Sequence, residues 1–193
     1  MRFFFGTIRS IIFTIGSLAL VPALWAGEST AFEVAKEANR YVGEQAKDRV
    51  VQIRSEKSIG GLSPNIWYVV FHDPTATFKA VEVKFGGGKM LDVKRPVRPF
   101  DFGGSKPLNR DKLKVDSDTA IKTAAHESML EKLTLKAVQA KLEDNDDFGP
   151  VWKLKFWAAK LRDPNDQAEI GEIWVSVDDG KVVKNDLHIN RVD

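Results

Sequence analysis

The feature that most constrains this chain is a β-hairpin pattern that occurs twice. Residues 171–184, GEIWVSVDDGKVVK, alternate apolar and polar side chains, turn at an Asp-Asp-Gly sequence and begin a return strand. Residues 81–91, VEVKFGGGKML, match residues 173–183 in their apolar, turn and lysine positions. A second correspondence relates IWYVVF at 66–71 to VWKLKF at 151–156. We interpret the chain as a duplication of one unit.

Each copy is predicted to begin with a helix. The first follows a capping box, in which Thr30 caps the helix and Glu33 reaches back to it, and the helix runs to about Val42. The second starts after Asp116 or Ser117 as its N-cap and carries a stripe of alanine, isoleucine and methionine. Both helices therefore have one apolar side that a sheet can cover.

Strands are expected after each helix. They are placed at 49–55, 66–71, within 134–142, at 151–156 and in the two hairpins. A helix with one apolar stripe and a half-apolar sheet bury these surfaces against each other. The sequence therefore predicts an α+β fold of two tandem helix-plus-antiparallel-sheet units. The expected boundaries are 27–94 for the first unit, 95–112 for a linker rich in proline and glycine, and 113–193 for the second unit.

Three segments resemble the PepSY domain family. They are LKVDS from Leu113, VWKL from Val151 and IWVSVDDGKV from Ile173, and copies of that domain begin with a capped helix and end in such a hairpin. The resemblance covers about 113–188 and, more weakly, 29–94, where glycines replace the acidic turn residues. It implies a tandem pair of cystatin-like α+β units, exported or membrane-associated. It also implies a binding role, often proposed to be inhibition of a peptidase, with no catalytic residues.

Residues 1–26 are predicted to be a secretory signal peptide. They combine a basic start, an apolar run at 11–21 and a small-residue cleavage region between Ala23 and Ala26. The alternative is an uncleaved membrane anchor, but the run is shorter than the roughly 20 apolar residues that a spanning helix needs. We expect a periplasmic or secreted bacterial protein without a stable membrane span after cleavage. The absence of cysteine leaves it without disulfides.

The charge balance argues against a polyanionic partner. The formal net charge of +2 equals the contribution of Arg2 and Arg9, which both lie in the predicted signal peptide. Removing them leaves equal numbers of basic and acidic residues. Bulk charge therefore gives no support for nucleic-acid or anionic-membrane binding.

No catalytic, cofactor-binding or metal-binding residue is predicted. His72, His126 and His188 belong to no recognised motif and are interpreted as scattered surface residues. The acidic segment 143–149 lacks the ligand pattern of an EF-hand and is interpreted as a solvated strand connection instead of a calcium site. Gly86 to Lys89 lacks the spacing of a phosphate loop and is interpreted as a hairpin turn. An enzyme is therefore the weakest functional hypothesis.

Three aromatic residues are predicted to point away from the helices. Strand alternation puts Trp152 on the core face, and Tyr68, Trp157 and Trp174 on the opposite face. A hairpin centred between Asn165 and Asp166 would set Trp157 and Trp174 opposite each other on neighbouring strands. Two accounts remain open. Either the two sheets or the linker residues Phe100 and Phe102 cover these side chains, or they form a docking surface for a partner protein.

The favoured function is that of an exported, non-catalytic binding module. Its expected partner is a cell-envelope peptidase, which it modulates or inhibits, or another protein. The residues expected to bind the partner are Tyr68, Trp157 and Trp174. The alternative is an envelope structural or assembly protein that oligomerises through its sheet face.

Overall fold

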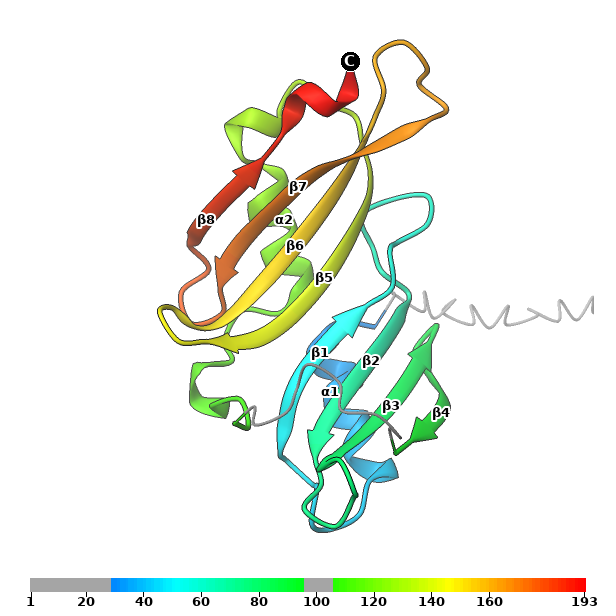
Figure 1. The fold of residues 1–193 in the computed structure, drawn as a ribbon, viewed down its shortest axis with the longest axis vertical. Helices are drawn as coiled ribbons and strands as arrows, with labels where there is room; N and C mark the ends of the chain where they lie inside the picture. The colour runs from blue at the N-terminus through cyan, green and yellow to red at the C-terminus, as the bar shows by residue number, and fades with distance from the viewer. Residues whose placement is uncertain (1–28, 96–105) are drawn as a thin grey trace, which may run out of the picture.

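The computed structural model describes residues 29–95 and 106–193, and its main feature is one eight-stranded antiparallel sheet (Figure 1). The strands are β1 (Val50–Ser55), β2 (Ile66–His72), β3 (Ala80–Gly86), β4 (Lys89–Lys94), β5 (Leu135–Asn145), β6 (Gly149–Ala159), β7 (Gln167–Ser176) and β8 (Val182–Leu187). Their order across the sheet is β4-β3-β2-β1-β5-β6-β7-β8. The predicted signal peptide, and Phe100 and Phe102 of the predicted linker, lie outside the described residues.

The prediction of two tandem helix-plus-sheet units is wrong. The described residues are 42% strand and 19% helix, and their strands form a single sheet. β1 and β5 join the two halves as antiparallel neighbours, with Gln52 opposite Glu143 and Arg54 opposite Lys141. In separate units each of these strands would be an edge with unpaired N–H and C=O groups. Pairing the two edges satisfies those groups and makes the sheet continuous.

Two buried serines extend this junction beyond the last paired residues of β1. The Ala140 N–H donates to Ser55 Oγ at 2.9 Å. The Val138 N–H donates to Ser58 Oγ at 2.8 Å, and the Ser58 N–H donates back to the Val138 carbonyl at 2.8 Å. Serine side chains thus replace main-chain partners where β1 leaves the sheet, so that β5 keeps its hydrogen bonds.

Two short α-helices lie on the same face of the sheet (Figure 1). They are α1 (Ala31–Ala38) and α2 (Ser117–Ala125), accompanied by the 3₁₀ turns η1 (Asn39–Tyr41), η2 (Arg110–Lys112), η3 (Ser128–Leu130) and η4 (Ile189–Val192). The predicted capping box of Thr30 and Glu33 is confirmed. The helix ends earlier than predicted, because the chain tightens into η1 after Ala38. Within the described residues, no helix is long and apolar enough to cross a membrane.

The N-termini of the two helices meet at Asp116. Its carboxylate accepts the Ser117 N–H of α2 at 2.6 Å and the Phe32 N–H of α1 at 3.1 Å. The Ala31 N–H donates to Ser117 Oγ at 3.1 Å. One acidic side chain thus supplies hydrogen-bond acceptors for the free N–H groups of both helices, where both helix dipoles favour negative charge.

A single apolar core runs across the junction between the halves. Strand alternation also predicts an inward Trp67 in β2. Trp67 and Trp152 of β6 both point inward, and their rings meet edge to face with centroids 6.4 Å apart. Phe32 of α1 lies 6.2 Å from the Trp152 ring. The two indole N–H groups donate to main-chain carbonyls, which satisfies their only polar atoms inside the core. The core, like the sheet, therefore joins the two halves.

Candidate binding surface

The face of the sheet opposite α1 and α2 has no described helix over it, and we call it the open face (Figure 1). Side chains alternate along each strand, so this face carries the residues between those of the core. The open-face residues considered below are Gln52, Arg54, Tyr68, Glu82, Lys84, Lys141, Glu143, Lys153, Lys155, Trp157, Glu172, Trp174 and Lys184. All three sequence-predicted site residues lie here and are half-buried.

Tyr68 of β2 lies between two cations. The guanidinium carbon of Arg54 is 4.0 Å from the ring centroid, and Lys84 Nζ is 5.0 Å from it. The Tyr68 hydroxyl donates to Glu56, which also pairs with Lys84 at 3.1 Å. The hydrogen bond from Tyr68, followed by that from Lys84, holds the pKa of Glu56 below its ordinary value. Arg54 also pairs with Glu82 at 2.7 Å, so Tyr68 is fixed within a connected polar network.

Trp174 of β7 has a lysine from each neighbouring strand near its ring. Lys153 of β6 and Lys184 of β8 are its direct cross-strand partners, and their Nζ atoms lie 4.1 and 4.5 Å from the ring centroid. The Phe148 ring meets the indole edge to face at 6.3 Å. The indole N–H donates to Glu172. The register of three strands therefore fixes an aromatic ring with cations close to it.

Trp157 of β6 does not lie opposite Trp174, and that prediction is wrong. The β6–β7 hairpin turns about Asp163, with Ala159 opposite Gln167, so that Trp157 pairs with Glu169. A bulge between Phe156 and Trp157 then changes the register by one residue. The bulge depends on Gly171, whose φ of +115° is closed to ordinary side chains. A Cβ atom at this position would be 2.2 Å from the Asp186 carbonyl oxygen. Trp157 instead has Lys57 from the β1–β2 connection over its ring, with Nζ 4.5 Å from the centroid.

Glu143 lies at the centre of the open face, beside the β1–β5 junction. It accepts from Lys141 Nζ at 2.6 Å, from Lys153 Nζ at 2.7 Å and from Gln52 Nε2 at 3.2 Å. Burial raises its pKa, but the hydrogen bonds from the two lysines outweigh burial and the pKa lies below the ordinary value. Glu143 is predicted from the sequence to begin a solvated strand connection. This prediction is wrong, because Glu143 lies within β5, which continues to Asn145.

Strand alternation in the sequence predicts that the three aromatic residues point away from the helices. It does not predict the charged side chains around them. Lys153 and Lys184 lie near the Trp174 ring only because of the strand register, and the register cannot be derived from one sequence. Strand alternation also predicts an exposed Val70 on this face, but Val70 is fully buried and forms a small second cluster with Val51 and Ala80. No aromatic contact between described residues joins Tyr68, Trp157 and Trp174 to one another.

The histidines take separate positions. His126 Nδ1 contacts the Lys122 carbonyl at 2.7 Å, and His188 Nε2 lies 3.5 Å from Asp186. His72 Nδ1 is buried without a hydrogen-bond partner. Across residues 29–95 and 106–193, no group of three or more His, Asp or Glu side chains is placed to hold a metal ion.

Comparison with known proteins gives no relative: no protein family, no curated protein and no solved structure matches this chain. The resemblance to the PepSY domain thus stays a prediction from the sequence. The geometry of the open face is the basis for a functional proposal.

Proposed function

We propose that this protein is an exported, non-catalytic binding module that docks a partner protein on the open face of its sheet. The observation that carries the proposal is the set of three half-buried aromatic residues on this face, each with at least one cation over its ring. Tryptophan, tyrosine and arginine are the residues most often found as energetic hot spots of protein interfaces. Their rings are held in place before binding, which lowers the entropy lost on docking.

The continuous sheet supports the proposal through its size. Eight strands spaced about 4.8 Å apart span about 34 Å, and strands of six residues are about 20 Å long. Such a surface approaches the roughly 800 Å² that one partner buries in a standard protein interface. Joining the halves through β1 and β5 makes this area uninterrupted.

The charge pattern of the open face favours a protein over a polyanion. Five of the six basic side chains named on this face form an ion pair with an acid, as in Arg54–Glu82 and Lys153–Glu143. A nucleic-acid surface would instead carry an excess of unmatched lysine and arginine. An interface of aromatic anchors within a polar, internally paired surround is typical of non-obligate protein complexes.

The proposed partner is a cell-envelope peptidase, which the module modulates or inhibits. Two sequence features support this choice: the predicted signal peptide at residues 1–26 and the resemblance to the PepSY domain. The test is affinity capture from a bacterial envelope fraction with the wild-type protein and with Trp174→Ala. We expect the wild type to capture a peptidase and the variant to lose it.

The same variant must remain folded for this test to be decisive. Trp174 is half-buried, so its removal is expected to lower the melting temperature by only about 2–4 °C. Lys132→Gln, at an exposed position outside the open face, is the control and retains capture. Capture of no peptidase by the wild type, or a large fall in the melting temperature of Trp174→Ala, would contradict the proposal.

A second candidate is an envelope assembly protein that self-associates. The feature in its favour is β4, an edge strand with Met90, Leu91 and Val93 exposed by 37%, 56% and 39%. Exposed apolar edge strands pair readily with further strands. Light scattering over a range of concentrations separates the two functions, because a stable oligomer favours assembly and a monomer favours binding of a different protein.

A further inference from the structure

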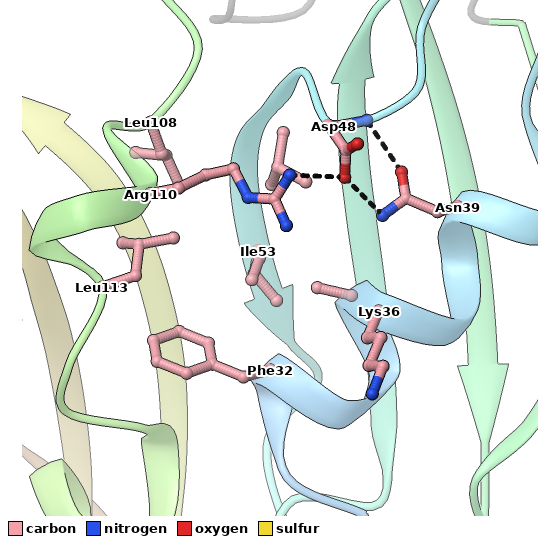
Figure 2. A pocket seen from close by; sticks show the side chains of 10 residues that line it. Phe32, Lys36, Asn39, Asp48, Ile53, Leu108, Arg110 and Leu113 are labelled. Carbon is pink, nitrogen blue, oxygen red and sulfur yellow. Dashed lines mark hydrogen bonds and ion pairs between the residues drawn. The ribbon is translucent and has the colours of Figure 1, made fainter. Parts of the chain in front are cut away.

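A pocket of about 230 Å³ lies on the helix side of the sheet, away from the open face (Figure 2). One wall is α1, which contributes Phe32 and Ala35. The other wall is residues 108–113, where the predicted linker ends and the second half begins, before α2. The pocket therefore lies between the two halves of the chain and is formed by residues of both.

The inside of the pocket is apolar and its walls are tied together. Ile53 of β1 lies behind α1 and residues 108–113, and Leu108 and Leu113 lie on the wall opposite Phe32 (Figure 2). Val50 of β1 also lines the pocket. The Leu108 N–H donates to the Val50 carbonyl at 2.7 Å, which fixes this segment to β1 beyond its last residue pair with β5, Gln52–Glu143. The pocket is thus formed in the absence of any ligand, as small-molecule sites usually are.

Polar side chains surround the rim. Asp48 has a φ of +60° and is held by Asn39, which accepts the Asp48 N–H at 2.8 Å and donates to its carboxylate at 3.2 Å. Arg110 reaches across from the opposite wall and pairs with Asp48 at 2.8 Å (Figure 2). Both side chains of this pair are more than half exposed, so water screens the attraction and a competing carboxylate can draw Arg110 away.

The rim carries an excess of positive charge. Lys36 of α1 lies on it and is exposed, and no carboxylate of the described residues lies within ion-pair distance of its ammonium. Arg110 and Lys36 together outnumber the one acid, Asp48. An apolar pocket with a net cationic rim matches an apolar molecule that ends in an anion.

We propose that this pocket binds a small monocarboxylic acid with one aromatic ring or a short acyl chain. An apolar cavity of about 150 Å³ is enough to hold a benzene ring, whereas drug-sized ligands occupy roughly 300–1,000 Å³. The volume of about 230 Å³ therefore fits a single ring or a short chain. The apolar part lies between Phe32 and Leu113, and the carboxylate lies towards Lys36 and Arg110. This site does not depend on the function proposed for the open face.

The test is a titration of the whole isotope-labelled protein with phenylacetate and hexanoate, followed by NMR. We expect saturable shifts at the signals of Ile53, Leu108 and Leu113. Phenylacetamide has the same ring without the charge and is expected to bind more weakly. Lys36→Gln and Arg110→Gln are each expected to weaken phenylacetate binding about two- to fivefold, the range of exposed ion pairs. Lys132→Gln, distant from the pocket lining, is expected to leave binding unchanged.

A steric variant tests the position of the apolar part. Ala35→Leu fills the pocket from a half-buried position on α1, and leucine favours a helix. We expect it to weaken binding about tenfold, as overpacking does. Absence of saturable shifts at millimolar acid, or equal binding of the acid and the amide, would overturn the proposal. Tighter binding of a peptide that ends in phenylalanine than of phenylacetate would assign the pocket to a chain terminus and overturn it as well.

Discussion

Glu143 connects the lysine of the Trp174 site to the junction of the sheet. It accepts hydrogen bonds from Lys141, Lys153 and Gln52 across three neighbouring strands. Its pKa is lowered in the folded protein despite burial, so the folded state favours its ionised form. This stabilisation is fully present above the ordinary glutamate pKa of about 4.5 and is lost as the pH falls through the lower folded value.

Glu143→Gln is therefore expected to lower the free energy of unfolding at neutral pH by about 1 kcal/mol, since solvent screens much of the pairing. The difference between the wild type and the variant shrinks as the pH falls below about 4.5. Urea unfolding at neutral and acid pH measures this difference in the free energy of unfolding. Glu131→Gln, at an exposed position, is the control. A difference that is independent of pH would show that the carboxylate charge contributes nothing.

Gly171 lies at the bulge between β6 and β7, next to Trp157. Its φ of +115° is accessible almost only to glycine, and an added Cβ meets the Asp186 carbonyl. We expect Gly171→Ala to destabilise the protein by about 3 kcal/mol or more. Gly43→Ala is the matched control, because nothing lies within 4 Å of its Cβ position and its φ is not positive. Thermal unfolding of both variants checks this, and equal stability would contradict the strained bulge.

At the scale of elements, the two helices depend on one shared cap. Asp116 accepts the N–H groups of Ser117 and Phe32, which belong to different helices. Asp116→Ala is expected to cost about 2 kcal/mol, the upper end for loss of an N-cap, because two helix ends lose an acceptor. Thr30→Ala removes a cap from α1 alone and is expected to cost about 1 kcal/mol.

Asp116→Asn retains the acceptor oxygen and should recover most of the stability lost in Asp116→Ala. Chemical denaturation of the three variants ranks them. If Asp116→Ala is no more harmful than Thr30→Ala, Asp116 does not serve both helices.

Local elements were predictable because their signals lie within a few residues. The capping box at Thr30, the inward tryptophans and the approximate positions of both hairpins follow from neighbouring side chains. The β1–β5 pairing was not predictable, since it is made by main-chain atoms and by Ser55 and Ser58, which look like ordinary loop serines. The lysines near Trp174 were missed because its cross-strand partners depend on where the two hairpins turn, and the β6–β7 hairpin turns about Asp163.

At the scale of the whole molecule, one sheet and one core predict one cooperative unfolding transition. Trp152 is fully buried and touches both Trp67 and Phe32 from the other half. Trp152→Ala is expected to cost about 3–5 kcal/mol and to lower the stability of both halves together. Native-state hydrogen exchange measures this by comparing the amides of β2 with those of β7. Retention of full protection in β2 would mean that the halves fold independently.

Site-specific photo-crosslinking tests the role of the open face most directly. A photoreactive residue replaces Lys155, on the open face, or Lys122, an exposed residue of α2 on the helix side. In a bacterial envelope the open face is predicted to give an adduct with a second, different protein when the probe is at 155 and none when it is at 122. Equal adducts from both positions, or adducts only between copies of this chain, would contradict the account.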